Sequence, residues 1–92
     1  MSPDTFDAFT IQAVIEGFDE VLERTWPPDA IHDTHTHPFA LKARVISGEM
    51  WLTVGDLTRH LSAGSDFELA RDEPHAERYG HQGATYWVAR RS

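Results

Sequence analysis

Two histidines separated by one residue, His35 and His37, carry the strongest chemical signal in the sequence. In an extended strand, residues i and i+2 point to the same face and lie about 6.6 Å apart along the chain. Two imidazole rings on one face can bind one ion where the strand bends or twists, and neutral imidazole suits divalent Zn, Fe, Ni, Cu and Mn. The pair is a weak motif by itself, because paired histidines on a strand are also common without a metal.

The other histidines are spread along the chain, and we expect only one of them to join this pair. His75 lies far downstream, at the start of a predicted strand. His32 is an odd number of residues from His35, so it should point the other way. It could be an outer ligand, although a solvent-exposed histidine is the simpler interpretation. His60 and His81 are predicted in a surface hairpin and a turn. The chain has no cysteine, so histidine and carboxylate side chains are the remaining candidate ligands.

The elements that must position these residues are mostly short strands. Apolar and β-branched runs alternate with turn residues, which is the pattern of an all-β sandwich or barrel. No long helix separates the runs, which disfavours a parallel α/β sheet. We expect Gly48 and the segment 80–83 to end strands. The predicted strands cover 20–26, 31–37, 41–47, 50–54, 57–61, 67–69, 75–79 and 84–89.

A short helix is predicted over about residues 4–17, packed against the outside or one end of the strands. Segment 2–4 offers a cap followed by acidic residues in the first turn, and Gly17 suits the helix end. Four apolar residues follow the i, i+3, i+4, i+7 spacing of one helical face, which we expect to be the packed face. These residues are Ile11, Val14, Ile15 and Phe18.

Length and charge narrow the class of protein. The 92 residues fit a single domain over 1–92, with the barrel over about 18–90. The chain has 15 acidic and 8 basic residues and a net charge of −7, so we expect neither a nucleic-acid partner nor binding to an anionic membrane. We find no apolar run long enough for a transmembrane helix and no signal peptide, and therefore expect a cytoplasmic location.

The spacing of histidines and glycines resembles the two motifs of the cupin superfamily. In the first motif, H-x-H is followed by three or four residues, a Glu, six residues and a Gly. His35, His37 and Gly48 fit it. In the second motif, a Gly is followed by five residues and then P-x-G-x-x-H, and Gly64 and His75 fit it. The resemblance covers roughly residues 20 to 90 and is closest to small single-domain bacterial cupins of unassigned function.

This resemblance implies an all-β, cupin-type jelly-roll barrel in which His35, His37 and His75 bind a divalent transition metal: Fe, Mn, Ni, Zn or Cu. The sequence departs from the motifs at three positions. Leu41 stands where the family has its Glu ligand, and Ala70 and Asp72 stand where it has Pro and Gly. The implied shell is therefore three histidines without a carboxylate, which leaves positions for water or substrate. Such a neutral shell favours an anionic ligand or a metal-bound hydroxide.

Two further residues are candidates for a catalytic role. By alternation, Glu77 and Tyr79 should share the inward face with His75. Glu77 could replace the missing carboxylate or act as an acid or base beside the metal. The plainer alternative, which we favour slightly, places it at the barrel rim, paired with Arg71, Arg78 or water. Tyr79 could donate a hydrogen bond to a ligand, although a packed aromatic is the simpler interpretation.

Two classes of function follow, because the fold does not decide between them. We favour a metalloenzyme of the dioxygenase, isomerase or lyase type that acts on a small polar or anionic substrate. The alternative is a non-catalytic module that binds a small ligand with or without metal, or a site that has lost its metal. The resemblance also implies a homodimer. Four aromatic residues are expected in the core or an interface: Trp51, Phe67, Tyr86 and Trp87.

Overall fold

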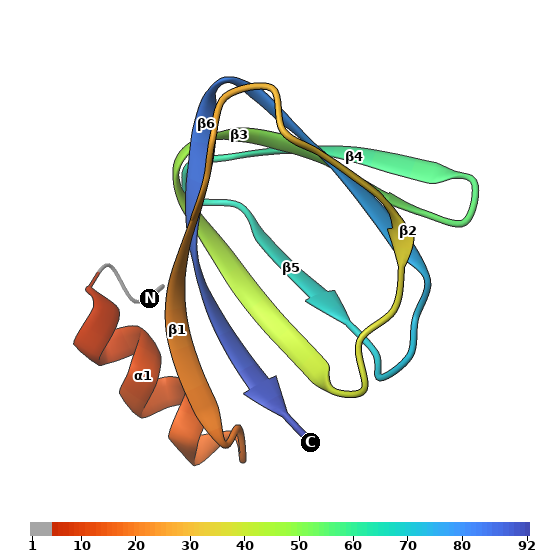
Figure 1. Ribbon diagram of the computed structural model, residues 1–92. Helices are drawn as coiled ribbons and strands as arrows, with labels where there is room; N and C mark the ends of the chain where they lie inside the picture. The colour runs from red at the N-terminus through yellow and green to blue at the C-terminus, as the bar shows by residue number, and fades with distance from the viewer. Residues whose placement is uncertain (1–4) are drawn as a thin grey trace.

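The computed structural model describes residues 5–92 and consists of one helix followed by a curled antiparallel sheet. The elements are α1 (Phe6–Ile15), β1 (Glu20–Trp26), β2 (Ile31–His35), β3 (Ala40–Val54), β4 (Leu57–Ser62), β5 (Asp66–Leu69) and β6 (His75–Arg91). The 6-stranded sheet has the order β1-β6-β3-β4, while β2 also pairs with β6 and β5 with β3. It closes around a common interior (Figure 1). The predicted all-β barrel with a short N-terminal helix is confirmed.

Two long strands, β3 and β6, form the centre of this sheet, where the sequence predicted two pairs of shorter strands. Gly48 does not end a strand, because β3 continues through it with shifts in register on either side. Segment 80–83 likewise lies within β6. Gly48 and Gly83 have φ angles of 74° and 67°. These left-handed conformations bend the strands without ending them, as glycine does at bulges.

The barrel interior is filled by side chains that alternate along β3 and β6. Alternation turns every second residue of a strand to the same face. The buried cluster contains Leu41, Ala43, Val45, Met50, Leu52, Leu61, Phe67, Leu69, Tyr79, Ala84, Tyr86 and Val88. Phe67 and Tyr86 are therefore core residues, as predicted. Trp51 is half-buried and lies against the guanidinium of Arg78, 4.1 Å from its carbon to the ring centroid.

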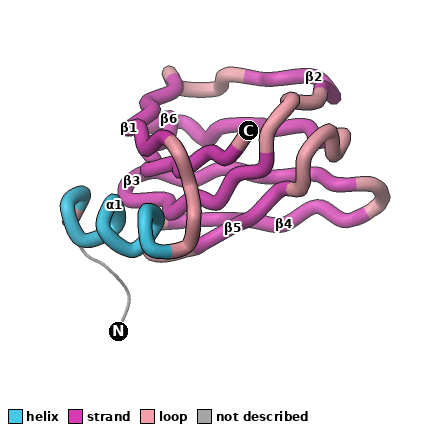
Figure 2. Tube along the Cα trace, turned by 90° about the horizontal axis from the view of Figure 1, so that it is seen from below, coloured by secondary structure: helices cyan, strands magenta, loops and turns pink. Residues whose placement is uncertain are grey.

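Helix α1 covers part of the outer face of the sheet, as Figure 2 shows from below. Its packed residues are Phe9 and Ala13, which join Trp87 and Ala89 of β6 in a second buried cluster. Three of the four residues predicted to pack are in solvent: the side chains of Ile11, Val14 and Ile15 are 63%, 62% and 73% exposed. Only Phe18, which follows the helix, packs against this cluster and is partly buried. Periodicity found the helix but selected the wrong side, because Trp87 offers an aromatic surface, 5.8 Å from the Phe9 centroid, that the pattern could not reveal.

The ends of α1 show how its boundaries arise. Thr5 is the N-cap, and its side-chain oxygen accepts a hydrogen bond of 3.1 Å from the backbone N–H of Ala8. The cap predicted over residues 2–4 lies outside the described residues. At the other end Glu16 is the C-cap and Gly17 follows it, as predicted. Lys42 of β3 forms an ion pair with Glu16 and so fastens the helix end to the sheet.

This packing predicts a clear difference between two apolar residues of α1. Phe9→Ala should lower the free energy of unfolding by about 3 kcal/mol, since it removes a buried aromatic side chain that is 4% exposed. Ile11→Ala should change it by less than about 0.5 kcal/mol, because that side chain is already in solvent. Urea denaturation followed by tryptophan fluorescence measures both. Equal losses in the two variants would contradict the observed orientation of the helix.

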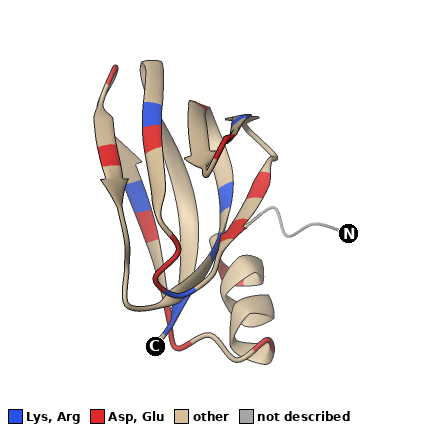
Figure 3. Ribbon diagram, turned by 90° about the vertical axis from the view of Figure 1, so that its right-hand side faces the viewer, with Lys and Arg blue, Asp and Glu red and all other residues tan. Residues whose placement is uncertain are grey.

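Basic and acidic positions are mixed over the strands that Figure 3 shows. Several of them form pairs between strands. Arg44 of β3 and Asp66 of β5, for example, are joined by two hydrogen bonds of 2.8 Å. Among residues 5–92, no helix is both long and apolar enough to cross a membrane.

Candidate metal centre

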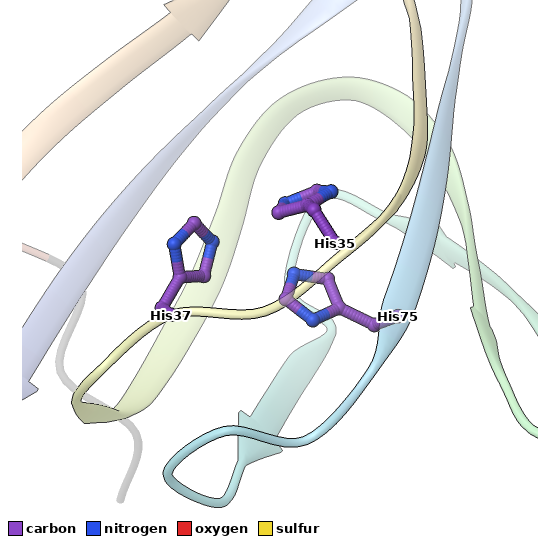
Figure 4. A group of neighbouring side chains, drawn as sticks. All are labelled: His35, His37 and His75. Atoms are coloured by element: carbon purple, nitrogen blue, oxygen red, sulfur yellow. The ribbon is translucent and has the colours of Figure 1, made fainter.

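Strand register brings three histidines together at one end of the barrel. His35 is the last residue of β2 and His75 the first of β6, and the two are direct partners in the antiparallel pairing. Their ring centroids lie 4.3 Å apart. His37 follows in the loop before β3, with its ring 4.8 Å from His35 and 5.1 Å from His75. One ligand nitrogen from each ring lies within 4.8 Å of the others, and the three rings converge in Figure 4.

The loop that carries His37 is held in place by the segment before β6. The backbone N–H of Asp72 donates a 2.9 Å hydrogen bond to the carbonyl of His37. Asp72 has a φ of 59°, a left-handed conformation that Asp adopts more readily than most residues. It occupies the position where the cupin-like motif has glycine. The backbone turn before His75 is therefore made without that glycine.

Hydrogen bonds at the back of two rings fix which nitrogen faces the centre. His35 Nδ1 lies 2.7 Å from the carbonyl of Asp33, and His75 Nδ1 lies 2.9 Å from the carbonyl of Glu73. A carbonyl only accepts, so each Nδ1 is the donor, and in the neutral form of the ring Nε2 is the atom with the free lone pair. Such backbone partners are common for metal-ligating histidines. The local fold thus prepares both rings as ligands.

The Nε2 atom of His75 supplies the test of whether a metal fits. His75 is 2% exposed, and its buried Nε2 has no hydrogen-bond partner within the described residues 5–92. A buried polar atom without a partner is costly, and native structures usually explain it by water, an ion or function. Here the atom faces two other imidazoles. The donor set fits a divalent transition metal held by His35, His37 and His75.

The protonation of His37 agrees with this interpretation. Burial lowers the pKa of His37, and the nearby His35 and His75 lower it further. The lowered pKa keeps the imidazole neutral to a lower pH, and the neutral form is the one that binds metal. The ring is also stacked on Phe39, with centroids 4.9 Å apart. His35 and His37 are only partly buried, so the centre is open to solvent on their side.

Glu77 and Tyr79 lie inside the barrel beside the three histidines. Glu77 is 8% exposed, and its Oε1 lies 3.7 Å from His75 Nε2. The Tyr79 hydroxyl donates a 2.8 Å hydrogen bond to Glu77 Oε2. Burial, followed by the neighbouring Tyr86 and Glu77, raises the pKa of Tyr79, so this hydroxyl stays protonated and remains a donor. The alternative position of Glu77 at the rim, paired with Arg71 or Arg78, is not the one observed.

His32 also reaches the interior, where alternation had placed it on the opposite face. The β2–β6 register shifts between His32 and His35, and an irregularity of this kind resets the facing of the residues beyond it. The His32 ring lies 4.3 Å from Trp26 and 6.2 Å from His35. Its Nδ1 lies 3.7 Å from Glu77 Oε2. Nothing in the residue types of 32–35 signals the irregularity, so sequence reasoning missed this neighbour.

The remaining sequence candidates lie away from the centre. His60 pairs with Glu49 at 2.8 Å on the surface, and His81 is 95% exposed beside Asp29. His81 is part of β6 and not of a turn. Leu41, at the position of the family's Glu ligand, is buried in the apolar core and pairs with Leu69. Glu77 is thus the carboxylate that the chain places next to His75.

Comparisons with known proteins bear on the fold. No protein-family model matches the sequence, and no curated protein matches it significantly. The structure resembles the DMSP lyase DddQ from Ruegeria pomeroyi DSS-3, with a TM-score of 0.72 and 22% identity over 78% of this chain and 37% of that one. It also resembles an RmlC-like cupin from Shewanella frigidimarina NCIMB 400, with a TM-score of 0.67 and 18% identity over 78% and 65%.

A third likeness is to an HTH_3 family transcriptional regulator from Vibrio cholerae, with a TM-score of 0.66 and 17% identity over 79% of this chain and 42% of that one. The chain spans less than two thirds of the length of each of these proteins. At such low identities the likenesses concern the fold alone, and they confirm the fold class predicted from the sequence.

Proposed function

We propose that this chain, which has the cupin fold, is a metal-dependent enzyme whose ion is held by His35, His37 and His75. The observation that carries the proposal is the buried, unpartnered Nε2 of His75 facing two other imidazoles. A divalent transition metal at this position would supply a Lewis acid or an oxygen-binding site. The substrate would be a small polar or anionic molecule that enters from the partly exposed side of His35 and His37.

The roles of the protein's own groups follow from their positions. Glu77 is a carboxylate within reach of the centre, suited to accept or return a proton. Tyr79 holds Glu77 through its hydroxyl and is itself 1% exposed. Its role is therefore to orient the carboxylate and not to contact the substrate. Dioxygenase, isomerase and lyase reactions are all compatible with this arrangement. The fold shared with a DMSP lyase supports the inclusion of lyase chemistry.

The alternative is a module that binds a small ligand without turnover. Leu41 supports it, because the family's carboxylate ligand is missing. The fold shared with a transcriptional regulator supports it as well, since that protein belongs to a class other than the enzymes. The homodimer implied by the sequence resemblance remains a prediction for either function.

Metal analysis of protein purified without a metal-affinity tag tests the proposal. We expect about one divalent transition metal per chain, directly or after reconstitution with Fe, Mn, Ni, Zn or Cu. The loaded protein should then consume oxygen with, or convert, a member of a panel of small carboxylates, diketones and DMSP, while the apoprotein should not. A chain that retains none of the five ions would refute the metal centre. Stoichiometric metal without turnover would favour the binding module.

A further inference from the structure

Glu77 is a buried carboxylate whose ionic neighbours are all histidines. In the described part of the chain its charge-pair contacts are with His32 and His75, each at 3.7 Å, and none is with a lysine or arginine. Removing a carboxylate from water is costly unless a positive charge or strong hydrogen bonds compensate. Tyr79 supplies one hydrogen bond. A cation at the three histidines would compensate the carboxylate further.

The two oxygens of this carboxylate have different surroundings. Oε2 accepts the hydrogen bond from Tyr79 and faces His32 Nδ1. Oε1 is not the acceptor for Tyr79 and lies on the side of His75 Nε2, the atom that would bind the ion. Glu77 is therefore fixed at one end and presents an acceptor oxygen beside the centre at the other.

We propose that Glu77, held by Tyr79 and flanked by His32, makes this centre select small carboxylates that carry a hydroxyl or amino group on the adjacent carbon. This inference rests on the proposed metal-dependent function and names its class of ligand. An ion held by the three histidines would attract the ligand's carboxylate, and Glu77 Oε1 would accept a hydrogen bond from the neighbouring donor. Hydrogen bonds to a charged acceptor are stronger than those between neutral groups.

The negative charge of Glu77 makes the site more selective for hydroxycarboxylates than the three histidines alone would be. Three neutral imidazoles leave a divalent ion its full charge and would bind any small anion. The negative charge of Glu77 lowers the net charge of the site by one and repels any anion, and a donor on the ligand offsets that repulsion by a hydrogen bond to the carboxylate. A simple carboxylate therefore gains less than a hydroxycarboxylate of the same charge, because an unpaired acceptor next to it remains unsatisfied.

The test compares glycolate with acetate on the Co²⁺-loaded protein, using the visible absorption of the bound ion as the readout. The two ligands have the same charge and differ by one hydroxyl. We expect glycolate to bind at least about ten-fold more tightly than acetate. Part of this preference arises from chelation of the ion, so variants must separate the contribution of Glu77.

Glu77→Gln removes the charge and keeps the side-chain shape. We expect the ratio of acetate to glycolate dissociation constants to fall about ten-fold, because the neutral amide accepts the hydrogen bond of the glycolate hydroxyl more weakly than the carboxylate does, whereas the loss of charge repulsion strengthens both ligands alike. Glu68→Gln is the matched control, since it makes the same charge change at an exposed residue of β5 and should leave the ratio unchanged. Tyr79→Phe keeps the carboxylate but loses its hydrogen bond, and should lower the ratio about three-fold.

The outcomes separate this inference from the proposed function. A wild-type chain that binds no Co²⁺ contradicts the metal centre itself. A chain that binds Co²⁺ but shows no glycolate preference, or whose ratio is the same in wild type and Glu77→Gln, overturns the inference and leaves the centre intact. If Glu77→Gln retains no Co²⁺, the Tyr79→Phe variant decides. An acetate to glycolate ratio in Tyr79→Phe equal to that of the wild type then overturns the inference.

Discussion

Metal binding is expected to be lost when His75 is replaced by alanine. His75 is the most buried of the three histidines, and its Nε2 has no hydrogen-bond partner among residues 5–92. The loss of an outer partner of a ligand lowers metal affinity ten- to a hundred-fold, so removal of the ligand itself should lower it by more than about a hundred-fold. Competition with a chromogenic chelator measures the affinity of wild type and variant.

Thermal unfolding gives a second readout of the same change. An ion that binds only the folded state at about 100 times its Kd adds roughly 2.7 kcal/mol to the stability. Wild-type protein should therefore unfold at a higher temperature with metal than without it, whereas His75→Ala should show no such difference. His81→Ala is the control, because that ring is 95% exposed on the same strand. If His75→Ala binds the metal with wild-type affinity, His75 is not one of the ligands.

The second large effect is expected at Gly48, where β3 approaches its antiparallel neighbour β6 closely. A Cβ added to Gly48 would lie 2.1 Å from the carbonyl oxygen of Gly83, a backbone atom that cannot move independently of β6. The φ of 74° adds conformational strain. We expect Gly48→Ala to cost more than about 4 kcal/mol, which is a large part of the stability of a small domain.

Gly55→Ala separates the clash from the strain. Gly55 also has a positive φ, of 60°, but a Cβ there would meet nothing within 4 Å. Gly55→Ala should lower the free energy of unfolding by only about 1–2 kcal/mol, which is the strain of an alanine in the left-handed conformation. Denaturant unfolding followed by circular dichroism measures both variants, and a Gly48→Ala protein that cannot be obtained folded agrees with the expectation. If both substitutions cost the same, close approach of the strands at Gly48 would be disproved.

The sequence was sufficient for the features that depend on local alternation and on motif spacing. Alternation located the strands and placed Glu77 and Tyr79 on the face of His75, while the spacing of His35, His37 and His75 selected the three rings that converge. These inferences succeed because inward facing repeats every second residue as long as the strand stays regular.

The features that depend on irregular backbone or on residues distant in the chain could not be predicted from the sequence. The irregularity between His32 and His35 inverts the facing of His32. Gly48 lies inside β3 and not at its end, because a left-handed glycine can bend a strand as well as terminate it. The packed side of α1 was set by Trp87, a residue far along the chain, and not by the more regular apolar face.

The origin of the three ligands in two separate segments has a further consequence. His35 and His37 flank the end of β2, while His75 begins β6, and β3, β4 and β5 all lie between them in sequence. An ion bound to all three acts as a reversible cross-link that closes this long loop, and closing a loop restricts the unfolded chain. Stability measured for any variant therefore depends on how fully the cross-link is formed, so variants should be compared at equal occupancy.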